Sequence, residues 1–185
     1  MGNVTYSMTM SLDGYIAGPG GDIGWTAPDD ELFQFHLEQV RAVDAHVCGR
    51  GLYETMVYWE TAHENPSLPD HELEFARIWR ALPKVVFSRT LDSVIGNARL
   101  VREGLADEVS ALKRQYDGDI AVGGAGLAAE LTRLGLVDEY VPFIAPVVLG
   151  GGTPFLPSLE RPIALELADA RTFGSRVVYA RYRRA

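Results

Sequence analysis

Apolar and polar residues alternate along this chain with two different periods. Residues 4–10 alternate apolar and small polar side chains, and short apolar runs at 45–48 and 84–87 are typical of buried strands. Between these runs, apolar residues recur every three or four positions over 28–40 and 70–82, which predicts helices. Strands that alternate with helices in this way indicate an α/β sheet covered on both faces.

The stretch from Asp119 to Leu127 joins an apolar run to a helix pattern through three glycines. Glycine has no Cβ, so such a turn can adopt a positive φ and lets a ligand oxygen approach the main chain. The helix expected over 127–134 points its free N–H groups and the positive end of its dipole at the same place. The stretch therefore predicts a site for an anion such as a nucleotide. A tight turn that binds nothing is the alternative.

Two arginines directly follow predicted strands. An arginine that served only to keep the surface soluble could stand anywhere on it. The strand ends are Gly49-Arg50, Ser88-Arg89 and, without an arginine, Gly123-Gly124. Ligands of open α/β sheets bind at the carboxyl ends of strands, so three such ends on one edge would form a nucleotide-sized groove. A guanidinium fork matches a phosphate monoester such as the 2′-phosphate of NADP. Simple surface solubility is the alternative reading of both arginines.

The residues Gly124 to Ala129 also satisfy the G-x-G-x-x-A pattern of a Rossmann dinucleotide fold. That fold requires an acidic ribose ligand about 20 residues later, at the end of the next strand. Asp138 and Glu139 come too early and would begin that strand. The pattern therefore favours a different nucleotide-binding α/β sheet.

Composition limits the partners and the compartment. The 185 residues are 47% hydrophobic with mean hydropathy -0.01, which suits one domain over 1–185. The net charge is -8 and no basic run occurs, so nucleic acid and membrane are not expected as partners. Cys48 is the single cysteine, and the start of the chain has no secretory pattern, so we expect a cytoplasmic protein. The four histidines have no metal-ligand spacing, and no metal is expected.

Loops and prolines supply the remaining expectations. Asp13-Gly14 predicts a turn between two extended segments, and the glycine-rich loop 18–22 beside Trp25 is a candidate lid. The apolar run 137–149 contains Pro142 and Pro146, which argue for a bent or edge strand without continuous pairing. This run could pair across a two-fold axis in a homodimer, or it could be core.

Taken together, these residues resemble the dihydrofolate reductase superfamily, and most closely the branch that contains the reductase domain of bifunctional riboflavin-biosynthesis proteins. Five blocks occur in the family's order over nearly the whole chain. These blocks are Ser11 to Ala17, Val47 to Glu54, Val85 to Arg89, Val122 to Gly126, and Pro146 to Gly152.

The resemblance implies a three-layer α/β/α fold with a central mixed, mostly parallel sheet that binds NADPH across the strand ends. It implies cofactor contacts in three groups. The adenosine half and its 2′-phosphate would lie at Gly49, Arg50, Gly51, Leu52, Ser88 and Arg89, the pyrophosphate at Gly123, Gly124, Ala125, Gly126 and Leu127, and the nicotinamide near Thr9 and Ile16. Leu52 departs from the family, which often has a phosphate-binding threonine at this place.

On the substrate side, Trp25 and Asp30 resemble the tryptophan and the helix-borne carboxylate of dihydrofolate reductase. There the carboxylate supports protonation of the pterin ring while NADPH delivers a hydride. A helix N-terminus stabilises acidic residues, which explains Asp30 equally well.

The resemblance predicts an NADPH-dependent oxidoreductase that reduces a heterocyclic, pterin-like or pyrimidine-like small molecule. One alternative is 5-amino-6-(5-phosphoribosylamino)uracil reductase of riboflavin biosynthesis, for which a second basic cluster near the nicotinamide would be expected. A second alternative, from another class, is a module that binds NADP without turnover.

Overall fold

A computed structural model describes the whole chain, residues 1–185. In chain order, the strands and α-helices are β1 (Asn3–Ser11), β2 (Tyr15–Ala17), α1 (Asp30–Arg41), β3 (Val43–Gly49), α2 (Arg50–Met56), α3 (Tyr58–Thr61), α4 (Asp70–Ala81), β4 (Lys84–Phe87), β5 (Ala98–Val101), α5 (Leu105–Gln115), β6 (Asp119–Gly123), α6 (Ala125–Arg133), β7 (Glu139–Ala145), β8 (Thr153–Pro154), β9 (Leu165–Thr172) and β10 (Val178–Arg184).

Eight of these strands form one central sheet in the order β5-β4-β3-β6-β1-β7-β10-β9. The six strands from β5 to β7 are parallel, while β10 pairs antiparallel with both β7 and β9. The predicted fold class, a mixed and mostly parallel α/β sheet, is therefore confirmed. Short strands β2 and β8 pair with each other beside the main sheet.

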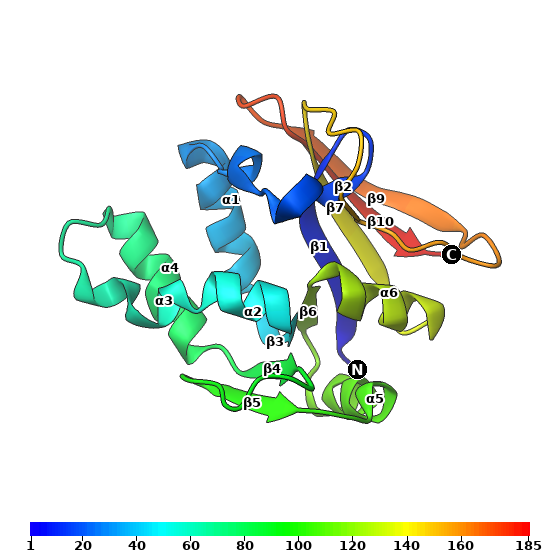
Figure 1. Cartoon of the computed structure of the whole chain (residues 1–185), viewed down its shortest axis with the longest axis horizontal. Helices are drawn as coiled ribbons and strands as arrows, with labels where there is room; N and C mark the ends of the chain where they lie inside the picture. Colours follow the sequence, from blue (N-terminus) through cyan, green and yellow to red (C-terminus); the bar gives the residue numbers. More distant parts are fainter.

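Helices cover the sheet on both faces (Figure 1). Successive residues of a strand point to opposite faces, and β3 shows the division clearly. Val47 packs in a cluster with Val109 of α5 and Leu131 of α6. Cys48, the next residue, packs in a second cluster with Leu37 of α1 and helix α4. Burial of these two apolar layers holds the sheet between the helices.

Strand β7 has the interrupted pairing expected from its prolines, but it lies inside the sheet and not at an edge. It lies between β1 and β10, and its residues are almost all buried, so Glu139–Ala145 is core, whereas Val148 further along the run is exposed. Pro142 faces Met8 of β1, but the register with β10 passes from Phe143 to Tyr140 without pairing Val141 or Pro142. The missing N–H of proline is thus accommodated by a local gap in pairing on one side.

The segment between α2 and α4 differs from the loop that its polar composition predicts. It contains the short helix α3 and a 3₁₀ turn at Ala62–Glu64. Glu60 of α3 is buried and pairs with the buried Lys84 Nζ at 3.1 Å, which ties α3 to β4. None of the helices combines the length and the apolar character that crossing a membrane requires.

Candidate functional site

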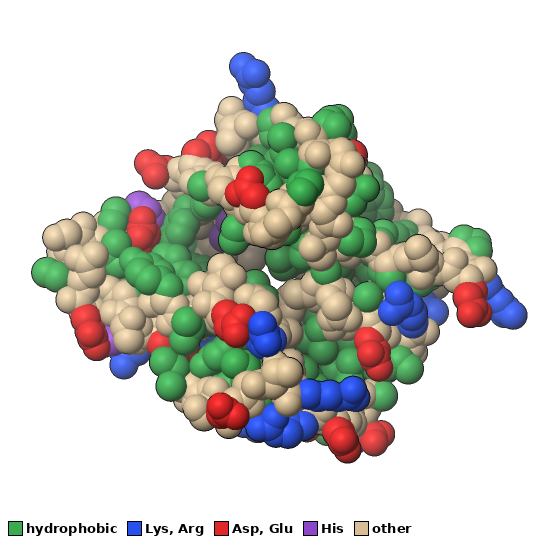
Figure 2. Space-filling model, viewed as in Figure 1, with side chains coloured by type: hydrophobic (Ala, Val, Ile, Leu, Met, Phe, Trp, Pro, Cys, Tyr) green, Lys and Arg blue, Asp and Glu red, His purple; other side chains and the backbone are tan.

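A cleft of about 840 Å³ lies at the carboxyl ends of the parallel strands. Figure 2 shows the hollow at the centre of this face. All three strand ends singled out in the sequence contribute to its wall, and β1 adds Thr9. Of the residues predicted to bind the cofactor, the lining contains Thr9, Ile16, Gly49, Arg50, Gly51, Leu52, Ser88, Arg89, Gly124, Ala125, Gly126 and Leu127.

The glycine turns after β3 and β6 lie against each other in this wall. Gly124 has φ +99°, and a Cβ added there would lie 3.5 Å from Gly49 Cα. Helix α6 begins directly after it, and Ala128 N–H donates to Gly124 O at 3.0 Å as the first bond of the helix. The amides before Ala128 therefore have no partner within the helix, and their residues, Ala125 to Leu127, line the cleft, an arrangement that suits anion binding.

Gly123 is the one residue predicted for the cofactor that does not line the cleft. A Cβ added at this position would overlap Leu52 Cδ2 and would lie 3.3 Å from His46 Cε1. The space beside Gly123 is thus filled by a neighbouring side chain. Gly123 allows α2 to pack closely on the sheet. A sequence pattern cannot distinguish a glycine needed for such packing from one that contacts a ligand.

One end of the cleft carries the basic side chains. Arg50 Nη1 donates to Thr90 Oγ1 at 2.9 Å, and the Ser88 hydroxyl accepts the N–H of Thr90 and of Leu91 at 3.2 and 3.1 Å. These bonds form a turn after β4 with Arg50 beside it. Arg89, which follows Ser88, completes this part of the lining.

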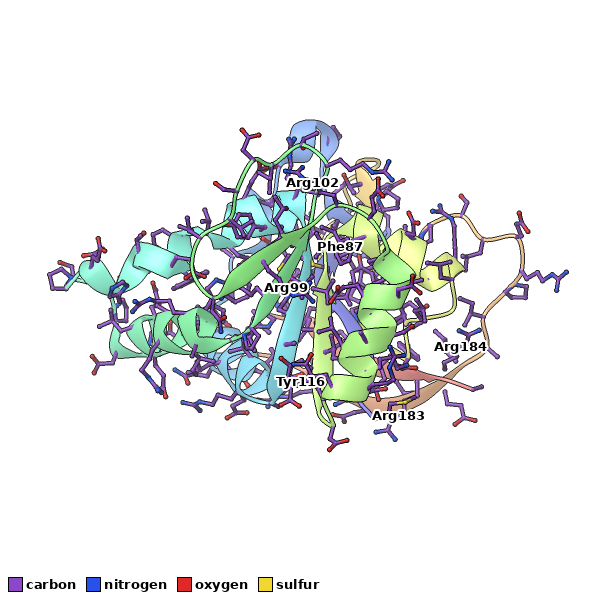
Figure 3. All side chains as sticks on the ribbon, turned by 90° about the horizontal axis from the view of Figure 1, so that it is seen from below. Phe87, Arg99, Arg102, Tyr116, Arg183 and Arg184 are labelled. Atoms are coloured by element: carbon purple, nitrogen blue, oxygen red, sulfur yellow. The ribbon has the colours of Figure 1, made fainter.

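Arg102 lines the same end and was not singled out in the sequence. Its guanidinium donates to Arg89 O at 3.2 Å and to Leu91 O at 2.9 Å, so it also fixes the turn after β4. Figure 3 shows Arg102 above Phe87, at the edge where β4 and β5 end. Arg102 directly follows the last residue of β5, and the same strand-then-arginine pattern could have identified it.

The opposite end of the cleft is lined without charged side chains. Its residues come from β1, β2, the segment between β2 and α1, and β8. They are Met8, Thr9, Ile16, Ala17, Gly21, Ile23, Thr26 and Thr153. In Figure 2 the Lys and Arg side chains near the hollow gather below it.

Asp13 fixes the loop that follows β7 to the turn between β1 and β2. Its carboxylate accepts the N–H of Leu149 at 3.1 Å and of Gly150 at 2.7 Å. A hydrogen bond from the Ser11 hydroxyl, with these backbone bonds, lowers the pKa of Asp13 to about 2. The predicted turn at Asp13-Gly14 is present, and Asp13 is part of its structure.

The structure does not bring Trp25 and Asp30 into the lining of the cleft. Trp25 Nε1 donates to Asp22 O at 3.1 Å. Asp30 is exposed in the first turn of α1, where the helix dipole stabilises a carboxylate. Asp29 caps this helix by accepting the N–H of Leu32 at 2.9 Å.

Two polar side chains lie next to each other on one face of β3. Cys48 Sγ and His46 Nδ1 are 3.1 Å apart. Burial lowers the pKa of His46 to about 4, helped by the charge of Lys84, and burial raises the pKa of the Cys48 thiol to about 12. Both groups are uncharged at neutral pH. No group of three His, Cys, Asp or Glu side chains is arranged to hold a metal ion.

The family model of the RibD C-terminal domain matches residues 3–179. The chain belongs to the RibD C-terminal domain family. The chain is 33% identical over 181 residues to the uncharacterized protein YyaP of Bacillus subtilis, and the match covers 97% of this chain and 93% of that protein.

Solved structures share the fold of this RibD C-terminal domain. The deaminase/5-amino-6-(5-phosphoribosylamino)uracil reductase of Thermotoga maritima superposes with TM-score 0.69 and 18% identity over 100% of this chain and 57% of that chain. Dihydrofolate reductase from Enterococcus faecalis, complexed with NADP(H), superposes with TM-score 0.65 and 17% identity over 98% and 96%. The family match confirms the suspected branch, and these likenesses confirm the fold.

Proposed function

We propose that this protein is an NADPH-dependent reductase that reduces a C=N or C=O bond of a heterocyclic small molecule. The observation that carries the proposal is the division of the cleft into two unlike ends. Arg50, Arg89 and Arg102 lie at one end, the glycine turn before α6 lies in the middle, and a surface of uncharged residues, apolar side chains and threonines, forms the other end.

This arrangement fits a phosphorylated dinucleotide. The free amides at the start of α6 would hold the pyrophosphate, and Arg50 and Arg89 would hold the 2′-phosphate beside the Ser88 turn. Thr9 and Ile16 would border the nicotinamide, and the apolar surface would keep water from the reacting atoms. When bound, NADPH supplies the hydride, while the protein orients it and the substrate.

The alternative is 5-amino-6-(5-phosphoribosylamino)uracil reductase. Family membership and the structural likeness to the Thermotoga maritima enzyme favour it. The phosphate of that substrate needs a second cationic group beyond the nicotinamide. Because the arginines of the cleft gather at the other end, we rank a substrate without phosphate first. An NADP-binding module without turnover is the remaining alternative, and oxidation of bound NADPH by a heterocyclic substrate would remove it.

The cofactor assignment is tested by fluorescence titration with NADPH and NADH. In the double variant Arg50→Ala/Arg89→Ala we expect NADPH affinity to fall by at least about tenfold, because charge-assisted bonds to the 2′-phosphate are lost, each contributing about 1.5–3 kcal/mol. NADH affinity should change little. Arg133→Ala, a surface variant on α6 outside the cleft lining, is the matched control. Equal losses for the two cofactors would contradict the assignment.

A further inference from the structure

The turn after β4, residues 88–91, leaves the sheet at its edge. Strand β5, which has only four residues, is the edge strand beside it. At the start of the turn, Ser88 N–H donates to Val101 O at 3.1 Å, but residues 89–92 make no hydrogen bond to another main-chain group. The position of this turn therefore depends on side chains.

Arg102, the residue after β5, holds the main chain of the turn. Its Nη1 donates to Arg89 O at 3.2 Å and its Nη2 donates to Leu91 O at 2.9 Å. A guanidinium is planar and rigid, so one group can hold two carbonyls at a fixed separation, which a single ammonium group cannot do. These bonds are made to the protein itself, so they are in place before a ligand binds.

The partners of Arg102 set it apart from a neighbouring arginine of the same strand. Arg99, within β5, forms an ion pair with Glu108 of α5 and does not line the cleft. In Figure 3, Arg102 lies at the end of this edge and Arg99 lies further back along it. Arg102 has carbonyls as partners where Arg99 has a carboxylate. The role of Arg102 is therefore to shape the main chain at the cleft.

Arg89 is the side chain whose position follows from this arrangement. It is exposed, it lines the cleft, and its guanidinium makes no hydrogen bond or ion pair within the protein. A free side chain of this length loses conformational entropy when it binds a phosphate. A fixed main chain limits that cost, because fewer bonds remain to be ordered on binding.

Arg50 is tied to the same turn from the side of α2. Its Nη1 donates to Thr90 Oγ1 at 2.9 Å, and its Nε lies 3.3 Å from Glu54 Oε1. The turn therefore also determines where Arg50 lies relative to Arg89. Displacement of the turn would separate the two guanidinium groups proposed to bind the 2′-phosphate.

We infer that Arg102 is a positioning residue for cofactor selectivity. It holds the turn so that Arg50 and Arg89 meet the 2′-phosphate of NADPH together, and this inference rests on the proposed function. The role requires the fork of the guanidinium, since a positive charge alone acts weakly through water and salt at an exposed site. Selectivity for NADPH over NADH then depends on a residue that acts through the main chain.

Fluorescence titration of Arg102→Ala and Arg102→Lys with both cofactors tests this role. We expect NADPH affinity to fall about three- to tenfold in both variants, the effect of one hydrogen bond. Lysine keeps the charge but cannot hold both carbonyls. NADH affinity should stay within about twofold, as should both affinities in the matched control Arg99→Ala. Full NADPH affinity in Arg102→Lys would show that charge suffices and would overturn the inference.

A direct contact between Arg102 and the phosphate is tested in the background Arg50→Ala/Arg89→Ala. There we expect Arg102→Ala to weaken NADPH binding by less than about twofold, because the groups that it positions are gone. A loss as large as in the unmodified background would show that Arg102 acts independently of the two arginines. That result would also overturn the inference.

The turn itself is tested in the cofactor-free protein by hydrogen exchange measured by mass spectrometry. Exchange should become faster in peptides covering 88–92 in Arg102→Ala and Arg102→Lys, and it should stay unchanged in Arg99→Ala. Unchanged exchange in all three variants would mean that Arg102 does not hold the turn. Retained NADH affinity and urea unfolding distinguish a displaced turn from loss of the fold.

The outcomes separate this inference from the proposed function. If the unmodified protein binds neither NADPH nor NADH, the proposed function fails, and the selectivity role of Arg102 fails with it. If the unmodified protein prefers NADPH and both Arg102 variants keep that preference, the inference alone fails and the cofactor assignment stands.

Discussion

Gly123 and Gly124 are adjacent and look alike in the sequence, yet they have different structural roles. Gly124 has φ +99° and borders the cleft, as the glycine-rich pattern predicts. Gly123 lies under Leu52 and His46, where a larger residue has no space. The pattern could predict that the turn needs glycines. It could not predict which glycine faces a ligand, because that depends on the packing of α2.

The same packing leads to a prediction about Gly123→Ala. Its methyl group would overlap Leu52, so we expect a loss of about 1–3 kcal/mol in the free energy of unfolding, as in other overpacked cores. Leu52→Ala in the same chain should recover part of that loss by making room. Urea unfolding of the two single variants and the double variant measures the coupling. Strictly additive effects would show that the two side chains do not compete for the space.

At the scale of elements, strands and helices were predicted well where the apolar residues follow a single spacing, every second position in a strand or every three to four positions in a helix. The alternation of β1 and the apolar runs of β3 and β4 are all found as strands in the structure. The prolines of β7 correctly predicted interrupted pairing, but they do not determine whether the strand lies at an edge or inside the sheet. A gap in pairing that spans only Val141 and Pro142 allows an interior position. That allowance depends on the register of β10, which lies about 40 residues later in the chain and leaves no local signal.

The loop after β7 depends on Asp13 for its position, and we expect Asp13→Asn to release it. An amide cannot supply two charged oxygens to the N–H groups of Leu149 and Gly150. Hydrogen exchange measured by mass spectrometry should become faster in peptides covering 147–155. It should stay unchanged in β6. Substrate KM should rise because Thr153, which lines the cleft, belongs to the same segment. Unchanged exchange in 147–155 would mean that the pairing of β2 with β8 holds the loop alone.

At the scale of the whole molecule, the sequence predicted that three strand ends would share one edge, and the structure places them around one cleft. This inference was possible because parallel strands run in the same direction, so their carboxyl ends lie at the same edge of the sheet. The environment of His36 could not be predicted in the same way. It depends on the rotation of α1 about its axis, which places the imidazole ring against Phe143 of β7. That rotation does not follow from any single segment.

Two buried histidines link the stability of the whole molecule to pH. The fold lowers the pKa of His36 and His46 from 6.5 to about 4, mainly through burial. Between these values the unfolded chain binds more protons than the folded protein. The stabilisation is therefore present above pH 6.5 and is lost as the pH falls toward 4, with each histidine contributing on the order of 3 kcal/mol over the full range.

We expect the urea midpoint to fall clearly from pH 7 to pH 5. Carboxylates whose pKa the fold lowers, including Asp13, Glu31 and Glu74, lose their contribution mainly at lower pH, so they affect this interval little. In the variant His36→Gln the urea midpoint should fall less between pH 7 and pH 5, because unfolding no longer lets this side chain bind a proton. In the surface variant His63→Gln the midpoint should fall by nearly as much as in the unmodified protein. If His36→Gln and the unmodified protein show the same change between pH 7 and pH 5, His36 is not held neutral by the fold. The ring of His36 would then be more open to water than its contact with Phe143 indicates.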